Sequence, residues 1–219
     1  MQKKVLRCRQ LFRIDGVGVD LNKFYPRTIV EKIQLRNELG YNIDDFIITN
    51  VAEINKNKNQ IMLVKALPIL KEQITNIRVL FIGKDNYPDV KNMVNKLNLG
   101  YLIEFLGYRN DIDKLITLSN LAFSASLREG LPINIIESMA CGIPIVCSRN
   151  RGHNSLILDG VSGLLFSVEN KNEMINKIIL IYKNQSLAEK LGKEAMKQSK
   201  KYSVDIALEK MSAIYKPFM

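Results

Sequence analysis

Short apolar runs rich in β-branched residues alternate with amphipathic stretches from about residue 46 onward, and this alternation limits the fold more than any other feature of the sequence. We predict strands over residues 46–51, 77–82, 102–106, 121–125, 142–147 and 163–166. Between them we predict helices over residues 59–74, 87–98, 111–118 and 133–140, with further helical segments towards the C-terminus. Asp111 is the expected N-cap of the third helix.

Strands that alternate with helices predict a parallel sheet with helices on both faces. The predicted strands are apolar throughout, which is typical of strands that are covered on two sides. We therefore expect an α/β fold, a Rossmann-like parallel sheet flanked by helices. Ligands of such sheets bind at the carboxyl ends of the strands, so the candidate loops follow Val51, Ile82, Leu106, Ala125 and Cys147.

The composition is that of an ordinary globular protein. The chain has 219 residues, 47% hydrophobic and 25% charged, which suits one or at most two domains. No apolar run is long enough to cross a bilayer, and no apolar core follows the basic N-terminus, so we expect a cytoplasmic protein without an export signal. The three cysteines (Cys8, Cys141 and Cys147) lack metal-ligand spacing, which favours reduced thiols and no metal site.

The formal net charge is +10, and its lysines are spread along helical segments. Solvated helix faces together with a compositional bias explain most of this excess. Attraction to an anionic membrane surface, which would place the protein peripherally at the inner face of the cell membrane, is the alternative. No nucleic-acid-binding motif is present, so we expect no nucleic acid as a partner.

The segment from Ser124 to Pro144 carries the most chemical information. Glu129 closes a strand-end loop, Gly130 permits close backbone approach to a ligand, and Pro132 stands where a helix would start. The first free amides of that helix, around residues 131–134, would form an anion site. Glu137 lies one turn into the helix, and beside a phosphate site a carboxylate suits neutral hydroxyl groups of a ribose or a sugar. Taken singly, each glutamate is more simply a solvated acidic residue.

Glu129 and Glu137, with seven residues between them in the sequence REGLPINIIESMACGIP, resemble the E-x7-E signature of family-4 retaining glycosyltransferases. Those enzymes have the GT-B fold, in which two Rossmann-like domains face each other across a cleft. The resemblance runs from about residue 14 to the end of the chain, and is closest to the exopolysaccharide and capsule type. Other similar segments, in the family's order, are residues 16–24, 105–109, 159–165 and 213–215.

The resemblance implies a set of site residues. Glu129 would contact hydroxyl groups of the donor sugar, Glu137 would contact the ribose, and Lys58 would neutralise the leaving diphosphate. The family's arginine falls on Glu53, a departure for which Lys56 could compensate. Glu129 and Lys58 are thus the expected catalytic residues, and no cofactor or metal is implied. Further substrate-binding residues would be Gly130, Leu131, Pro132, Ile133 and Asn134 at the diphosphate, Tyr108 and Arg109 at the base, and Gly152 beside the phosphates.

These roles agree with the chemistry. Breaking a sugar–diphosphate bond leaves negative charge on the leaving oxygens, which preorganised amides, a helix N-terminus and a lysine stabilise without a metal. Apart from the resemblance, Lys58 is more simply a solvated loop lysine. His153, the single histidine, is expected to be a surface or capping residue near a helix start rather than a general base.

The resemblance also implies a domain division. Residues 1–22 would be a linker or the tail of an N-terminal acceptor domain, and residues 23–203 the domain that binds the nucleotide sugar. Residues 204–219 would form a helix that packs on the acceptor domain, which this sequence lacks. As this chain alone, the protein would be an incomplete hexosyltransferase.

Three functional interpretations compete, and we discount the third. The first is the donor half of a retaining glycosyltransferase, with a UDP-sugar as donor and a polysaccharide or lipid-linked glycan as acceptor. The second is a non-catalytic nucleotide-binding module of a split or truncated protein. The third, a dinucleotide-dependent oxidoreductase, needs a glycine-rich turn after the first strand, and residues 51–55 contain no glycine.

Overall fold

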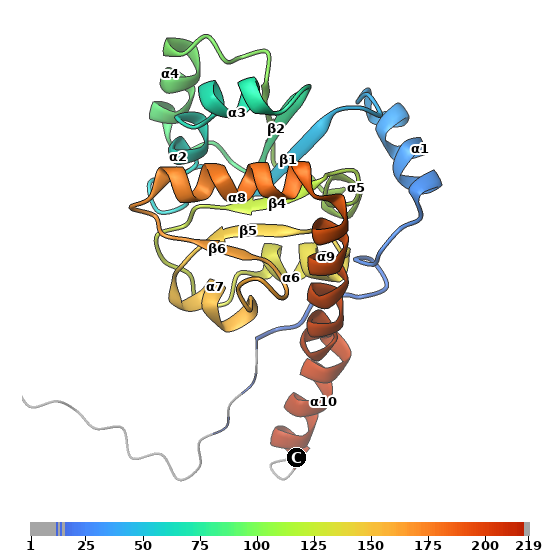
Figure 1. Cartoon of the computed structure of the whole chain (residues 1–219). Helices are drawn as coiled ribbons and strands as arrows, with labels where there is room; N and C mark the ends of the chain where they lie inside the picture. The colour runs from blue at the N-terminus through green and yellow to red at the C-terminus, as the bar shows by residue number, and fades with distance from the viewer. Residues whose placement is uncertain (1–11, 13, 15, 217–219) are drawn as a thin grey trace, which may run out of the picture.

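The computed structural model describes residues 12, 14 and 16–216. They form an open sheet of six parallel strands flanked by helices, which confirms the predicted fold class (Figure 1). The strand order is β3-β2-β1-β4-β5-β6. The strands are β1 (Phe46–Val51), β2 (Ile77–Ile82), β3 (Ile103–Gly107), β4 (Leu121–Ser124), β5 (Ile145–Ser148) and β6 (Leu164–Phe166).

Both faces of the sheet are buried, because alternate strand residues enter different apolar clusters. Ile48 and Phe81 pack with residues of α2, α3, α4 and α8, whereas Ile47 and Leu80 pack with residues of α1 and α5. A third cluster joins the sheet to α6, α7 and α9. The helices are α1 (Ile29–Leu39), α2 (Ile61–Val64), α3 (Leu67–Gln73), α4 (Pro88–Lys96), α5 (Ile112–Thr117), α6 (Ile133–Ala140), α7 (Arg151–Leu156), α8 (Lys171–Lys183), α9 (Gln185–Ser199) and α10 (Val204–Tyr215), with a short 3-10 helix at Lys200–Tyr202.

Several predicted elements differ from those observed. The helix expected over residues 59–74 is broken into α2 and α3, because Pro68 fits only the first turn of a helix and restarts it there. The strand expected from residue 142 begins at Ile145, since Gly142 has a φ of 69° and turns the chain after α6. Asp111 stands at the start of α5 but does not cap it with its side chain.

Helix α1 was not predicted, and α7 was expected only as a helix start near His153. Helix α1 begins with a capping box in which Thr28 and Glu31 bond reciprocally, and ends at Gly40 with a φ of 79°. Helix α7 is capped by Asn150, whose side chain accepts a hydrogen bond from the amide of His153. These polar start and stop signals are present in the sequence, but apolar periodicity is weak in both helices.

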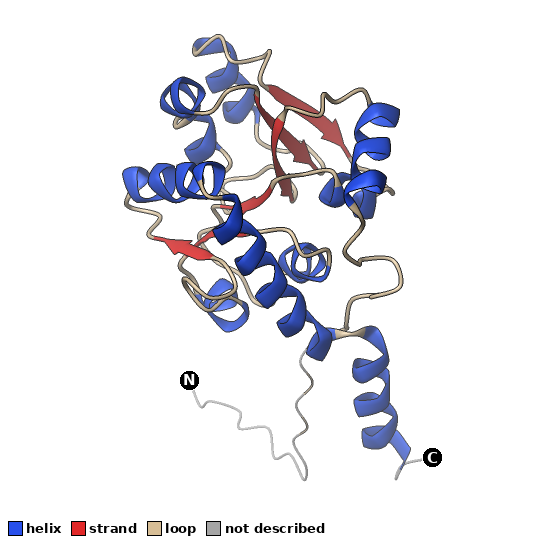
Figure 2. Cartoon of the chain, turned by 45° about the vertical axis from the view of Figure 1, so that its right-hand side comes forward, coloured by secondary structure: helices blue, strands red, loops and turns tan. Residues whose placement is uncertain are grey.

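The chain enters and leaves the domain at one place. The amide of Val19 donates to the carbonyl of Tyr202 at 2.8 Å, and the amide of Val204 donates to the carbonyl of Val19 at 3.0 Å. Beyond this bridge, α10 extends away from the sheet in both views (Figure 2). The predicted domain boundaries stay predictions, and Cys8 lies outside the described residues. Within the described part of the chain, no helix is long and apolar enough to cross a membrane.

Helix α9 packs closely on the turn after α6 at a glycine. A Cβ atom at Gly192 would stand 2.1 Å from the carbonyl oxygen of Gly142. We expect Gly192→Ala to lower the free energy of unfolding by about 1–3 kcal/mol, because this overpacking outweighs the gain in helix propensity. Thermal denaturation measures the change. The control is Gly100→Ala, whose Cβ would meet nothing within 4 Å; equal stability of the two variants would contradict the expectation.

Candidate functional site

The strand order reverses between β1 and β4, and this switch point at the carboxyl ends of the two strands is called the crevice below. In the order β3-β2-β1-β4-β5-β6, the connection from β1 leads to α2 on one face and the connection from β4 leads to α6 on the other. The loops that follow these two strands therefore start side by side at the carboxyl edge of the sheet and lead to opposite faces, and this edge is where open α/β sheets bind ligands. Lys58 lies in the first loop and Glu129 in the second.

Lys58 and Glu129 form an ion pair across this crevice. The Nζ of Lys58 donates to Oε1 of Glu129 at 2.6 Å, and the side chains are only 23% and 11% exposed. Partial burial strengthens the attraction relative to an exposed pair, because less water screens the charges. The structure thus brings together the two residues that we predicted to be catalytic.

Hydrogen bonds hold the two loops against each other. The amide of Leu127 donates to the carbonyl of Asn57 at 2.8 Å, and the side-chain amide of Asn57 donates to the carbonyl of Arg128 at 3.0 Å. Next to this contact, Oδ1 of Asn55 accepts a hydrogen bond from the amide of Lys58 at 3.0 Å. These bonds fix the backbone on both sides of the ion pair, so Lys58 is preorganised at the crevice.

Glu137 lies in a neighbouring cleft of about 530 Å³. The cleft is also lined by Tyr108, Arg109 and Glu53, and it opens at the carboxyl ends of β1 and β2. Burial raises the pKa of Glu137 to about 7, and Lys23 opposes the rise. Three residues predicted to bind ribose and base are therefore together in one cleft.

The raised pKa predicts a pH effect on stability. Between about pH 4.5 and 7 the folded chain holds a proton on Glu137 that the unfolded chain releases, so the folded state loses stability as the pH rises through this range. We expect Glu137→Gln to be more stable than wild type at pH 8, by about 1–3 kcal/mol, and nearly equal to it at pH 4.5. Thermal melts at both pH values measure this. The exposed Glu72→Gln is the control; a Glu137→Gln offset independent of pH would refute the expectation.

The start of α6 faces the crevice without a side-chain cap. Pro132 is the N-cap residue and lacks an N–H group, so Ile133 and Asn134 provide the first amides of the helix. The side chain of Asn134 donates to the carbonyl of Val51 at 2.8 Å and ties α6 to the end of β1. Gly130 is exposed, whereas the side chain of Leu131 packs against Gly16.

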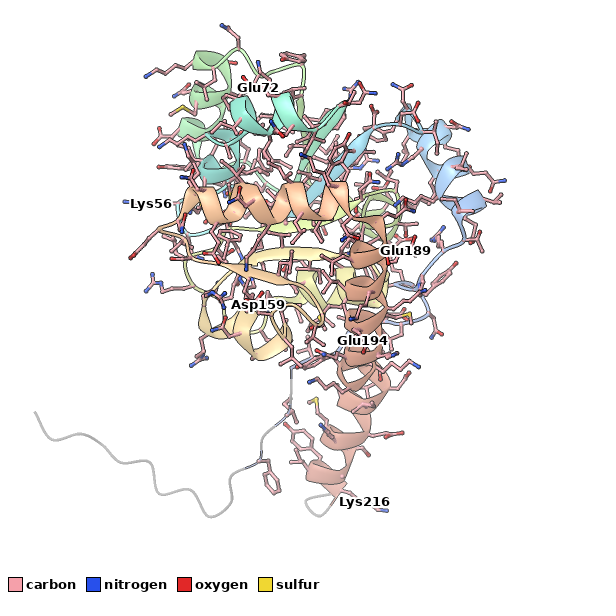
Figure 3. All side chains as sticks on the ribbon, viewed as in Figure 1. Lys56, Glu72, Asp159, Glu189, Glu194 and Lys216 are labelled. Carbon is pink, nitrogen blue, oxygen red and sulfur yellow. The ribbon has the colours of Figure 1, made fainter. Side chains whose placement is uncertain are left out.

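The remaining predicted site residues differ in their surroundings. Tyr108 is 82% exposed beside the cleft. Arg109 forms a two-pronged ion pair with Asp111, its Nε and Nη2 donating at 2.8 and 2.6 Å, which explains why Asp111 does not cap α5. Lys56 is exposed and extends into solvent at the edge of the molecule (Figure 3). The side chain of Glu53 accepts a hydrogen bond from Asn86.

Gly152 lies in the first turn of α7 rather than in a loop. A Cβ atom there would stand 2.5 Å from Cβ of Glu129, so only glycine allows the turn at residues 129–130 to rest on α7. The next residue corrects an expectation: His153 is not a surface histidine but fully buried. The polar sequence around His153 does not indicate burial. The burial arises because Ser148 and Asn150 contact the ring of His153 and the turn at Glu129 packs on Gly152, in the same turn of α7.

The Lys58–Glu129 pair lies where the strand order reverses and next to the uncapped start of α6. This arrangement is typical of Rossmann-like domains that bind a ligand at the edge of the sheet. Residues 31–198 match the family model of glycosyl transferases group 1. The chain belongs to this family, and its fold is that of a GT-B domain.

Two relatives named as glycosyltransferases agree with this membership of the family. The chain is 35% identical over 208 residues to a putative glycosyltransferase, EpsD, of Bacillus subtilis, covering 94% of this chain and 55% of the relative. It is 30% identical over 169 residues, 75% of this chain and 43% of the relative, to an Escherichia coli α-1,3-galactosyltransferase that uses UDP-Gal and GlcNAc-diphosphoundecaprenol. The chain thus spans about half the length of the curated relatives it matches.

Solved structures share the fold. Anabaena HepE, whose structure contains UDP and glucose, superimposes with a TM-score of 0.82 at 22% identity, covering 91% of this chain and 55% of that chain. A glycosyltransferase from Rickettsia africae superimposes with the same TM-score of 0.82 at 24% identity, covering 91% and 55%. At this level of sequence identity the superposition supports a shared fold and nothing more.

Proposed function

We propose that this chain is the donor-binding half of a retaining glycosyltransferase and that it binds a UDP-sugar in the crevice between β1 and β4. The observation that carries the proposal is the Lys58–Glu129 pair, 2.6 Å apart at the switch point and next to the uncapped start of α6. Structures of HepE with UDP and with UDP-glucose support the choice of donor.

The proposed roles follow from charge. Lys58 and the amides at the start of α6 stabilise negative charge on the diphosphate as the sugar leaves, so the transfer needs no metal ion. Glu129 accepts hydrogen bonds from hydroxyl groups of the donor sugar, and Glu137 accepts them from the ribose. Tyr108 and the backbone around Arg109 border the base.

The names of relatives support a proposal for the acceptor. Two of them act on sugars attached to diphosphoundecaprenol, which supports a lipid-linked glycan as acceptor. We propose that an acceptor domain supplies that site and packs on α10, where Leu208 is 60% exposed and Tyr215 57%. The excess of +10 charges would hold the assembly at the inner face of an anionic membrane.

One observation favours the second function, a nucleotide-binding module without catalysis. Glu53 lines the cleft at the position where the family has an arginine, and its negative charge opposes a diphosphate. Transfer to a lipid-linked acceptor, measured after adding the N-terminal half of a relative, separates the two functions. UDP binding without transfer, with every N-terminal half tried, would support the module.

Calorimetric titration of the purified chain tests the donor proposal. We expect saturable binding of UDP that is stronger than binding of GDP, ADP or NAD and unchanged by a metal chelator. Glu137→Ala should weaken UDP binding about 3- to 10-fold through lost ribose contacts, whereas Glu72→Ala, which removes the same charge at an exposed site, should not. Failure of the wild-type chain to bind UDP would refute the proposal for this chain.

A further inference from the structure

His153 has an unusual environment for the only histidine of the chain. It is fully buried in the first turn of α7. Its Nδ1 lies 2.7 Å from the carbonyl oxygen of Ser148 and 2.9 Å from the side-chain nitrogen of Asn150. That side chain is fixed from both ends, because its oxygen accepts from the amide of His153 and its nitrogen donates to the carbonyl of Ser126.

These contacts determine where the ring carries its proton. A carbonyl oxygen can only accept, so we assign a hydrogen to Nδ1 from its 2.7 Å contact with Ser148. The side-chain nitrogen of Asn150 is a donor and does not compete for this position, because its two hydrogens have acceptors in the carbonyl of Ser126 and Oγ of Ser148. Burial lowers the pKa of His153, which keeps the ring neutral near pH 7. The other ring nitrogen, Nε2, therefore bears a lone pair and acts as a hydrogen-bond acceptor.

Among the described residues, Nε2 is a buried acceptor without a hydrogen-bond partner. It belongs to the donor-sugar end of the candidate site, since Gly152 touches Glu129 and the charges of both Glu129 and Lys58 act on the ring. A buried acceptor without a donor is unfavourable, so this place in the fold is suited to a group that brings a hydrogen-bond donor.

The chemistry of a nucleotide sugar leaves one such group. Diphosphate oxygens are acceptors and cannot bond to a neutral Nε2. The ribose and the base, whose uracil N3–H can also donate, are placed by the proposed function in the neighbouring cleft, beside Glu137 and Tyr108. Hydroxyl groups of the sugar can donate, and at this end the carboxylate of Glu129 is already an acceptor of the same kind.

We propose that Nε2 of His153 accepts a hydrogen bond from a hydroxyl group of the donor sugar, next to the hydroxyl group held by Glu129. The inference rests on the proposed function and deepens it. Because His153 is fully buried, this hydrogen bond requires the turn at residues 129–130, which packs on the neighbouring Gly152, to shift when the sugar enters. His153 then contributes to the choice of sugar and not to the binding of UDP.

Two variants separate the two ring nitrogens. In His153→Asn the side-chain amide replaces Nδ1 and can still donate to the carbonyl of Ser148, but nothing replaces Nε2. In His153→Gln the amide reaches the position of Nε2 and can supply an acceptor there. Asn154→Ala, at an exposed residue of the same helix, is the control. Thermal melts establish that each variant is folded.

The measurement is the ratio of affinities for a UDP-sugar and for UDP, with UDP-glucose, UDP-galactose and UDP-N-acetylglucosamine as probes. We expect His153→Asn to reduce this ratio about 3- to 10-fold for the preferred sugar, with UDP affinity unchanged and with recovery in His153→Gln. An unchanged ratio in His153→Asn would overturn the inference. A loss of UDP affinity in His153→Asn would also overturn it, because Lys58 would then be the partner of Nε2. A wild-type chain that binds UDP and every UDP-sugar equally well would overturn it too.

A second measurement needs no variant. Because the chain has one histidine, labelling histidine with ¹⁵N gives one pair of ring signals. The Nε2 signal should move when a UDP-sugar is added and stay in place with UDP. UDP binding without any such movement would overturn the inference while leaving the proposed function intact, whereas absence of UDP binding would count against the proposed function itself.

Discussion

Lys58→Ala should weaken the binding of UDP to this chain by about 10- to 100-fold. The lysine is 23% exposed, and its ammonium group lies at the crevice between β1 and β4, so its loss removes a charge-assisted contact of about 1.5–3 kcal/mol from the diphosphate. Isothermal titration calorimetry measures the change. In a complete transferase the same substitution should lower the transfer rate about 100-fold or more.

Two further variants test whether the position of the charge at Lys58, and not only its sign, determines UDP affinity. Lys56→Ala removes an equal charge two residues away at an exposed position, and we expect it to change UDP affinity less than twofold. Glu129→Gln frees Lys58 from its partner and should leave UDP affinity equal or higher while lowering affinity for the UDP-sugar. Equal losses from Lys58→Ala and Lys56→Ala would mean that the diphosphate is attracted by the basic surface and not by a built site.

The largest effect on stability is expected at Arg36. Its side chain is 2% exposed, and its guanidinium group donates to the carbonyl of Leu118 through Nε and Nη2, at 3.0 and 2.8 Å. Its other acceptors are the carbonyls of Asn42, Ile43 and Asp45 and the side chain of Asn120, at 2.6–3.2 Å. Arg36→Met removes the guanidinium donor from the buried carbonyls of Leu118 and Asp45, so the free energy of unfolding should fall by about 3–5 kcal/mol.

For a domain of this size such a loss corresponds to a lower Tm by about 6–20 °C. The control is Arg78→Met, because the Arg78 side chain is 37% exposed and its contacts with Asp45 and Glu104, at 3.6 and 3.8 Å, are weak. We expect Arg78→Met to cost less than about 1 kcal/mol. A Tm change of the same size in both variants would show that the buried hydrogen bonds of Arg36 do not stabilise the fold to the expected extent.

The strands and α6 could be predicted because their signals are local. Residues 133–140 were predicted as a helix and are a helix with the same bounds, since an apolar face follows directly after Pro132. Helix α1 was missed because its buried residues are only Leu35 and Arg36, too few for an apolar period. Its capping box, Thr28 with Glu31, was the available signal.

The residues of the candidate site could be predicted from the sequence, but the distances between them could not. Resemblance to the family singled out Lys58 and Glu129, but their separation of 2.6 Å depends on how the loops after β1 and β4 meet. No local pattern encodes that meeting. The burial of His153 was missed for the same reason, because its ring contacts Ser148 of β5 and the cap residue Asn150 while the turn at Glu129 packs on the neighbouring Gly152.

The bridge between Val19 and Val204 has a consequence for engineering. Because the segments that enter and leave the domain are joined by two backbone hydrogen bonds, residues 19–203 begin and end at the same point in space. A unit with adjacent ends can be exchanged between relatives, or inserted into a host loop, without stretching the flanking chain. Chimaeras joined at these two positions would therefore transplant the whole sheet and its crevice as a cassette, and the sugar preference of the recipient should follow the cassette.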